Sequence, residues 1–453
     1  MSKGRQNSVH VTGVAGVGMS ALAQVLTWSH HLVTGSDRYR DQGVDLPVLH
    51  ALEQSGVTLV PQDGSAVNAS TAAVVYSTAI ERGNPDFMAA EKYGVPCVHR
   101  AKMLAEEAAG HPVWAVAGTA GKTTTTGMLG WILEQIGLNP TVVNGGALVD
   151  WAGEGSVGNV RRGAPDSPWV LEVDESDRSL LEFHPEWSIL TNISQDHFSL
   201  VEVRKLFRRY AEQVHTGVIC GPGVAEVLGP LRALRIEPEF KLESGADGGA
   251  WLRWRGTRLR VRLPGRHNLL NGLLAAELCA QLGGNPMDIA EALGRFNGIQ
   301  RRLERVDRGG AVSIFDDYAH NPIKIAAAWN AASDCAKGRR ILGVWRPHGF
   351  KPLRDMLSPL ADALTAVMRP SDRLWLLPVY YAGGTVDAAS VSSDDLARQL
   401  QMRGVNVGVV ADYSALAGIL LREAHAGDTI LLMGARDPAL PDFARRLADS
   451  LHS

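Results

Sequence analysis

The 453-residue sequence contains no apolar run close to the ~20 residues that a membrane-spanning helix needs. Residues 1–8 are polar and lead directly into a strand-like segment, without the apolar core of a signal peptide. The four cysteines are far apart and form no CxxC pair, so neither a disulfide framework nor a zinc site is indicated. With a formal net charge of −3, the chain also lacks the basic surface expected of a nucleic-acid-binding protein. These absences predict a cytoplasmic protein that interacts with neither membranes nor nucleic acids.

Short apolar runs alternate with longer helical patterns along the whole chain. The clearest strand and helix pairs are 9–11 with 19–28, 72–77 with 86–93, and 114–117 with 122–136. This alternation predicts α/β domains in which helices cover parallel sheets. Residues 251–263 differ, because arginines alternate with apolar residues around a Gly-Thr turn, and they predict a β-hairpin.

The length of the chain suggests about three domains of roughly 150 residues each. Two breaks between helical and strand-like patterns lie near residues 108–112 and 296–298. We therefore expect domains over residues 1–109, 110–299 and 300–453.

A phosphate-binding loop is the sharpest local signal. It follows the strand-like residues 113–117, opens a helix, and consists of Gly118, Thr119, Ala120, Gly121, Lys122, Thr123 and Thr124. Glycines let backbone N–H groups approach phosphate oxygens, and a helix N-terminus adds partial positive charge. Lys122 can reach the outer phosphates of a nucleotide, and the Thr123 hydroxyl can bind Mg²⁺. The loop is shorter than the general GxxxxGK[ST] pattern.

A second strand-like segment, residues 170–173, ends in the acids Asp174, Glu175 and Asp177. Ligands of doubly wound sheets bind at the carboxyl ends of the strands. These carboxylates could therefore hold Mg²⁺ opposite Thr123. Without the phosphate loop, the same acids would more simply form a solvated turn.

Taken in order, these motifs resemble those of the Mur ligases over nearly the whole chain. Residues 118–124 resemble GT-x-GKT[TS], 174–177 match DESD, 191–197 match TNI..DH, 265–271 resemble GxHNxxN, 300–302 resemble QRR and 316–322 resemble DDYAHxP. The DESD and TNI..DH forms are similar to the branch that uses UDP-N-acetylmuramate directly. The resemblance implies a Rossmann-like N-terminal domain, a central P-loop-type mononucleotide-binding α/β domain and a Rossmann-like C-terminal domain.

The glycine turn at residues 13–18 follows the first strand and is similar to the HxxGIGGxGMS segment of the same branch. Taken alone, such a turn also fits a nicotinamide-binding Rossmann domain. Beside a second nucleotide loop, a UDP diphosphate is the better interpretation. The resemblance then assigns the UDP-sugar to Gly16, Gly18, Met19, Ser20, Ser36, Asp37, Thr78 and Ala79.

The family reaction implied by the resemblance is ATP-dependent amide formation in bacterial peptidoglycan synthesis. It joins L-alanine, or another small amino acid, to the lactoyl carboxylate of UDP-N-acetylmuramate through an acyl phosphate. The resemblance implies a monomer or homodimer in the bacterial cytoplasm. A recycling ligase that adds a preformed peptide, and a non-catalytic sensor of the same nucleotides, are the alternatives.

The resemblance also assigns roles to individual residues. Lys122 neutralises the outer phosphates of ATP, and Mg²⁺ is held by Thr123, Glu175 and His197. Asn268 and Asn271 lie three residues apart and can read adenine from one helix face, although Asn268 could equally cap that helix. The third domain supplies Arg302 for a phosphate, Asp317 for the ribose, and Tyr318 and the catalytic His320 on the acceptor side. Arg301 and Arg302 could instead form a surface charge pair.

The resemblance breaks at the acceptor side. The alanine-adding branch carries PHRYTR, whose arginines hold the carboxylate of the incoming amino acid, whereas residues 347–352 are PHGFKP. Gly349 and Pro352 cannot supply a bidentate guanidinium. The family's GAGD becomes Gly-Ala-Arg-Asp at residues 434–437, which adds a new cation. The remaining candidates for the acceptor side are His348, Lys351, Arg354 and Arg436.

Overall fold

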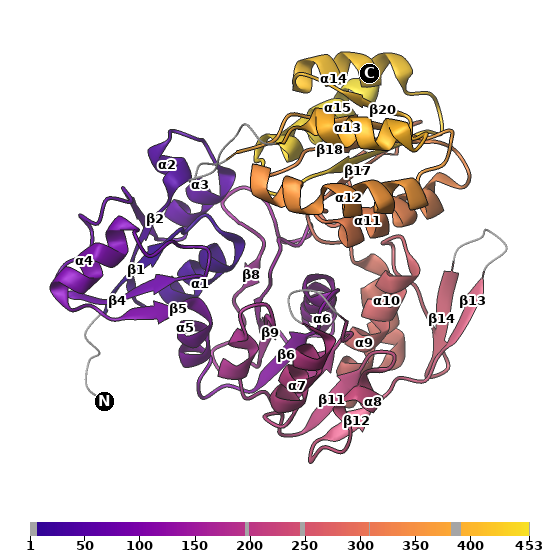
Figure 1. Cartoon of the computed structure of the whole chain (residues 1–453). Coiled ribbons are helices and arrows are strands. Elements are labelled where there is room, and N and C mark those ends of the chain that lie inside the picture. The colour runs from indigo at the N-terminus through magenta and orange to yellow at the C-terminus, as the bar shows by residue number, and fades with distance from the viewer. Residues whose placement is uncertain (1–6, 195–198, 245–249, 308, 382–390, 453) are drawn as a thin grey trace. The chain divides into compact units, whose positions relative to one another are not determined.

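The computed structural model describes residues 7–194, 199–244, 250–307, 309–381 and 391–452 (Figure 1). The chain divides into two compact units, one of residues 1–262 with 266–299, and one of residues 300–453 with 263–265. Among the described helices, none is long and apolar enough to cross a membrane. Each unit is considered by itself below.

The N-terminal sheet of the first unit is parallel and has the order β3-β2-β1-β4-β5. Its strands are β1 (Ser8–Thr12), β2 (Leu32–Ser36), β3 (Thr58–Val60), β4 (Thr71–Tyr76) and β5 (Cys97–His99). The helices are α1 (Val17–Trp28), α2 (Arg38–Asp41), α3 (Pro47–Gln54), α4 (Pro85–Tyr93) and α5 (Arg100–Glu107). Because β1 is central and pairs with β2 and β4, the turn that follows it lies where a doubly wound sheet binds its ligand.

The central sheet of the same unit has the order β12-β11-β10-β6-β9-β7-β8, with only the β7–β8 pair antiparallel among its described pairings. Its strands are β6 (Val113–Ala117), β7 (Thr141–Val143), β8 (Val160–Arg161), β9 (Trp169–Glu172), β10 (Trp187–Leu190), β11 (Gly217–Cys220) and β12 (Leu234–Ile236). The helices are α6 (Lys122–Gln135), a 3-10 turn (Ser179–Glu182), α7 (Leu200–Ala211), α8 (Val224–Leu228), α9 (Arg266–Gln281) and α10 (Pro286–Arg295). The phosphate loop connects β6, in the middle of this sheet, to α6.

The predicted hairpin is confirmed as part of a small antiparallel sheet. Its strands are β13 (Lys241–Ser244), β14 (Ala250–Trp254) and β15 (Thr257–Leu259). Trp254 is fully buried, and its indole N–H donates to Glu277 on α9 at 2.6 Å. This contact fixes the small sheet on the central domain.

The two large sheets of the first unit share one cluster of buried apolar side chains, which extends from Val9 and Leu26 to Leu171 and Phe207. A buried polar contact crosses the same junction, because the Gln24 amide donates to Asn159 at 3.1 Å. The expected boundary at residues 109 and 110 therefore lies inside one compact unit.

The second unit contains a sheet of order β16-β17-β21-β18-β19-β20, parallel except for the β16–β17 pair. Its strands are β16 (Glu304–Arg305), β17 (Ser313–Asp317), β18 (Ile341–Trp345), β19 (Arg373–Leu376), β20 (Val407–Val409) and β21 (Thr429–Met433). The helices are α11 (Pro322–Ala336), α12 (Phe350–Val367), α13 (Ser393–Met402), α14 (Tyr413–Glu423) and α15 (Ala439–His452). Separate apolar clusters cover the two faces, one around Trp329 and Trp345 and the other around Leu432 and Phe443.

Candidate functional site

The phosphate loop has a backbone that requires glycine. Gly118 has φ +138°, and a Cβ at this position would lie 2.0 Å from Thr191 Oγ1. Gly121 has φ +82° and caps α6, so the helix begins at Lys122. The first N–H groups of a helix have no acceptor within it and can bind an anion. The loop therefore has the geometry that phosphate binding needs.

Two side chains that directly follow β10 form hydrogen bonds with the phosphate loop. The Asn192 amide donates to the Ala120 carbonyl at 2.8 Å, and its oxygen accepts from the Thr119 hydroxyl at 2.5 Å. The Thr191 hydroxyl donates to the same Ala120 carbonyl at 2.6 Å. The conformation of the loop is thus set by Thr191 and Asn192, which belong to the predicted TNI motif.

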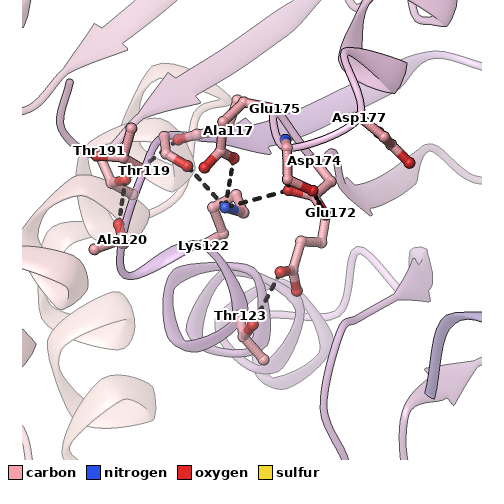
Figure 2. Close-up of polar contacts among 12 residues, drawn as sticks. Ala117, Thr119, Ala120, Lys122, Thr123, Glu172, Asp174, Glu175, Asp177 and Thr191 are labelled. Carbon is pink, nitrogen blue, oxygen red and sulfur yellow. Dashed lines mark hydrogen bonds and ion pairs between the residues drawn. The ribbon is translucent and has the colours of Figure 1, made fainter. Parts of the chain in front are cut away.

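Lys122 points toward the acidic end of β9 (Figure 2). Its ammonium lies 2.6 Å from Glu175 and 3.6 Å from Asp174, and it also donates to the Gly118 carbonyl at 2.9 Å. Burial alone would lower the pKa of Lys122, but the nearby carboxylates outweigh it and the pKa is raised. Burial also raises the pKa of Glu175 in spite of the lysine. Lys122 is therefore protonated, with its ammonium next to the backbone of the phosphate loop.

The carboxylate next to Thr123 is Glu172, the last residue of β9. The Thr123 hydroxyl donates to Glu172 Oε1 at 2.9 Å (Figure 2). The Gly145 backbone N–H donates to Glu172 Oε2 at 2.7 Å. Among the described residues, no group of three or more His, Cys, Asp or Glu side chains is arranged to hold a metal ion. A hydroxyl and a carboxylate that leave room for phosphate oxygens nevertheless suit Mg²⁺, which prefers few protein ligands.

Asn268 and Asn271 lie buried on one face at the start of α9, and the Asn271 amide contacts the Asn268 oxygen at 3.4 Å. A Cβ on Gly121 would lie only 2.7 Å from Asn271 Oδ1. The two amides therefore lie beside the phosphate loop, and Asn271 leaves no space for a side chain at position 121.

The glycine turn after β1 lies beside the turn at residues 77–80, because a Cβ at Gly13 would lie 2.9 Å from Ile80 Cδ1. Thr78 and Ala79 are exposed there. Asp37 accepts the backbone N–H groups of Ala15 and Tyr39, both at 3.0 Å. Backbone groups and exposed loop residues are therefore what this region offers to a ligand.

Besides Asp37, three of the residues expected to bind the UDP-sugar have buried side chains that the fold itself uses. Met19 belongs to the core of the first unit. The Ser20 hydroxyl donates to the Val17 carbonyl at 3.0 Å, and the Ser36 hydroxyl donates to Asp86 at 2.6 Å. These three residues can meet a ligand only through their backbone.

Arg100, the first residue of α5, reaches between the glycine turn and the acidic strand end. Its guanidinium would lie 3.0 Å from a Cβ on Gly18, and it lies 3.8 Å from Asp174 and 3.9 Å from Asp177. Burial would raise the pKa of Asp177, but His99, Ser179 and Arg100 outweigh it and hold that pKa well below its usual range. A cation of the N-terminal domain thus lies next to both predicted motifs.

In the second unit, the Arg301 side chain connects two strand ends through hydrogen bonds. Its guanidinium donates to the buried Asp316 at 3.2 Å and to the Gly434 carbonyl, and its backbone has φ +59°. Arg302 lies over the Tyr318 ring at 5.8 Å. The alternative prediction for Arg301 and Arg302 was an exposed charge pair, and these contacts differ from it.

Asp317 ends β17 and accepts the backbone N–H groups of Leu303 at 2.7 Å and Ala319 at 2.8 Å. Burial raises its pKa to about 6, although the charge of Arg302 opposes this. The His320 ring meets those of Tyr318 and His348 edge-on, with centroids 5.6 and 5.4 Å away. The residues expected on the acceptor side of β17 and β18 are thus neighbours.

Comparison with known proteins agrees with this geometry. Residues 8–112 match the catalytic domain of the Mur ligase family, residues 116–204 the Mur ligase middle domain, and residues 301–436 the Mur ligase glutamate ligase domain. The UDP-N-acetylmuramate–L-alanine ligase of Rhizobium meliloti (strain 1021) is 33% identical, covering 94% of this chain and 93% of the relative. The chain belongs to the Mur ligase family.

Two further relatives cover nearly the whole of this Mur ligase. The UDP-N-acetylmuramate–L-alanine ligase of Symbiobacterium thermophilum is 34% identical over 99% of this chain and 95% of the relative. The crystal structure of the UDP-N-acetylmuramate–alanine ligase from Thermotoga maritima superposes with a TM-score of 0.79, at 25% identity and 98% coverage of both chains. The three-domain architecture predicted from the motifs is confirmed.

The sequence did not single out three residues that the Mur ligase structure places in the site: Glu172, Asn192 and Arg100. Glu172 looked like an ordinary strand residue, and only its contact with Thr123 distinguishes it from Glu175. Asn192 was part of a recognised motif but had no predicted role. Arg100 had no motif at all. The predicted metal ligand His197 and its neighbour Asp196 lie outside the described residues.

Two of the residues expected on the acceptor side, Lys351 and Arg354, lie on α12 near the same carboxylate. Asp355 is 2.5 Å from Lys351 and 3.7 Å from Arg354, and all three side chains are about half exposed or more. Arg436 is exposed on the loop after β21. Lys351 and Arg354 therefore lie beside a carboxylate on α12, whereas Arg436 lies on a separate loop.

Proposed function

We propose that this Mur ligase uses ATP to activate the lactoyl carboxylate of UDP-N-acetylmuramate and then joins an amino acid to it, L-alanine in the first instance. The observation that carries the proposal is the start of α6, where Lys122 and Thr123 lie against separate carboxylates at the end of β9. The relatives matched over nearly their whole length are named for this ligation. We place the reaction in the bacterial cytoplasm, within domains at residues 1–109, 110–299 and 300–453.

In the first step, a carboxylate oxygen attacks the γ-phosphorus of ATP, and ADP leaves. Negative charge collects on the transferred group, so fixed cations and N–H donors stabilise it. Lys122 binds the phosphate oxygens, and Glu175 and Asp174 keep the ammonium protonated and aimed at the loop. The N–H groups at the start of α6 bind the same phosphates.

The residues around Thr123 suit Mg²⁺. We assign it to the Thr123 hydroxyl and the Glu172 carboxylate, in place of the Thr123 and Glu175 pair expected from sequence. When bound, Mg²⁺ offsets the charge on the phosphate oxygens of ATP. Glu175 then serves Lys122 and not the metal. His197 stays a predicted ligand.

In the second step, the amine of the acceptor attacks the acyl carbon, phosphate leaves, and the nitrogen loses a proton as the amide forms. The glycine turn, with Arg100 beside Gly18, holds the diphosphate of the UDP-sugar during both steps. In the third domain, Arg302 binds a phosphate of ATP and Asp317 binds its ribose. His320 and His348 line the acceptor side.

Trapping of the acyl phosphate tests this function. With ATP, UDP-N-acetylmuramate and hydroxylamine but no amino acid, the enzyme should release ADP and form the hydroxamate of the lactoyl group. Addition of L-alanine should divert the product to the amide. If both nucleotides bind but no hydroxamate forms, the activation step is excluded. Binding of a nicotinamide dinucleotide at residues 13–18 would contradict the assignment of the glycine turn.

A further inference from the structure

Three basic residues occupy equivalent positions above neighbouring strands of the third-domain sheet. β21 lies between β17 and β18, and the last residues of the three strands are in register with one another. Three residues beyond that line come His320 after β17, Arg436 after β21 and His348 after β18. The topology therefore places Arg436 on the middle strand of the three, beside the two imidazoles, whose ring centroids lie 5.4 Å apart.

The loop that carries Arg436 is anchored at both ends. At one end, the Gly434 carbonyl accepts from Arg301. At the other, Asp437 is buried, pairs with Arg346 at 2.5 Å and accepts from the Tyr413 hydroxyl. Arg436 is the exposed residue between these anchors. Its backbone is thus held in place while its side chain faces solvent.

Burial lowers the pKa of His320, and the charges of Lys324, Arg302 and Arg436 add to that shift. Burial also lowers the pKa of His348 to about 4, and the charges of His320 and Arg436 add to it. Both rings are therefore neutral near neutral pH. Within the described part of the chain, no hydrogen bond or ion pair engages the Arg436 side chain, whereas Lys351 is paired with Asp355.

The loop after β18 has lost the capacity to provide such a cation. Gly349 has φ +77°, a conformation that residues with a Cβ rarely adopt, and a Cβ there would lie 3.2 Å from Pro352 Cδ. Its N–H donates to the Tyr380 carbonyl at 2.9 Å. Gly349 is the N-cap of α12 and Pro352 lies in the first turn of that helix, so neither position offers a side chain that could bind a carboxylate.

We propose that Arg436 binds the α-carboxylate of the incoming amino acid, beside His320 and His348, in the role that the resemblance gives to arginines at positions 349 and 352. This inference rests on the proposed function. A guanidinium forms short, charge-assisted hydrogen bonds with a carboxylate, and the flanking neutral imidazoles add no competing charge. The acceptor class is then an amino acid or peptide whose carboxylate lies within reach of its reacting amine.

The test compares L-alanine with ethylamine, which is L-alanine without its carboxylate. In Arg436→Gln, KM for L-alanine should rise by about 10- to 100-fold, because a charged hydrogen bond is lost. The kcat/KM for ethylamine should not change, so the preference for L-alanine falls by the same factor. Arg436→Lys should recover part of that preference. KM for ATP and hydroxamate formation without amino acid should match the wild type.

The control is Arg422→Gln, an exposed arginine on α14 of the same unit, which should leave every constant unchanged. If Arg436→Gln keeps its preference for L-alanine while it forms hydroxamate normally, the role of Arg436 is refuted and the proposed function stands. A loss of preference in Lys351→Gln but not in Arg436→Gln also refutes it. Failure of the wild type to form hydroxamate refutes the proposed function itself.

Discussion

The phosphate loop of the central domain can be compared with the carboxyl edge of the third-domain sheet that carries His320, Arg436 and His348, here called the acceptor edge. Both lie at the carboxyl ends of parallel strands, but they match the family motifs to different degrees. The loop retains glycine, lysine and threonine at each position that the backbone or the phosphate requires. At the acceptor edge, two arginines are replaced by Gly349 and Pro352, and a third appears at 436. If Arg436 binds the acceptor as proposed, the phosphate loop depends on several backbone positions, whereas the carboxylate depends on one cation that either of two neighbouring loops could carry.

Removal of Lys122 should produce the largest effect. We expect Lys122→Ala to lower hydroxamate formation by on the order of 100- to 1,000-fold, because a positioned cation no longer stabilises the transferred phosphate. UDP-N-acetylmuramate binding, measured by calorimetry, should stay within about twofold, a change of only about 0.4 kcal/mol. Lys102→Ala, at an exposed position on α5, is the control. Equal loss of UDP-sugar binding in a folded variant would show that the two regions are not independent.

Removal of Asp437 should show how firmly the acceptor edge is held. In Asp437→Ala, Arg346 loses its buried counterion and the Tyr413 hydroxyl loses its acceptor, which should cost about 3 kcal/mol. Urea unfolding measures this loss. Asp362→Ala removes an exposed partner of Arg403 and should cost less than about 1 kcal/mol. Similar losses in the two variants would mean that Asp437 does not anchor the loop.

The two glutamates at the end of β9 should respond differently to Mg²⁺. We expect Glu172→Gln to weaken Mg²⁺ activation by about 10- to 100-fold, with activity restored at higher Mg²⁺ concentration. Glu175→Gln should leave the Mg²⁺ requirement unchanged and raise KM for ATP, because its partner is Lys122. A Mg²⁺ titration of the two variants at saturating ATP separates these roles. The reverse pattern would return the metal to Glu175.

Sequence reasoning worked best where local patterns decide the structure. The strand and helix pairs around β1, β4 and β6 are confirmed to within about two residues, the usual precision of helix and strand ends, because each strand is apolar and each helix opens at a glycine or capping residue. The hairpin predicted at residues 251–263 is confirmed over residues 250–259 for the same reason, while residues 260–263 lie outside its strands. Local apolar periodicity is therefore sufficient to predict the elements of this fold.

The partners of the site residues could not be predicted in the same way. Glu172 ends β9 and Glu175 lies in the bend three residues later, and which one meets Thr123 depends on the register of β9 against β6 and on the loop at residues 144–146. The contact between Arg100 and Asp174 joins residues that are more than 70 positions apart in sequence and that belong to two different sheets. No local pattern carries that information, because it arises from packing.

The smallest expected effect concerns the neutral imidazole beside Arg436. The pKa of His348 lies near 4 in the folded chain and near 6.5 when unfolded, so the unfolded chain binds the proton more tightly between these values. Stability contributed by His348 is therefore present above about pH 6.5 and is lost as the pH falls toward 4. At about pH 5 the loss should be about 1 kcal/mol, allowing for the partial exposure of the ring.

His348→Asn cannot take up this proton, so its thermal midpoint should fall by a few degrees less than that of the wild type between about pH 7 and 5. His30→Asn, at an exposed histidine of the first unit, should follow the wild type. If His348→Asn also follows the wild type, His348 is not a neutral ring in a desolvated edge, and the cation at 436 would lie in a wetter and less selective environment. If the midpoints diverge as expected, Arg436 lies beside two neutral imidazoles, whereas Lys122 in the phosphate loop lies beside charged carboxylates.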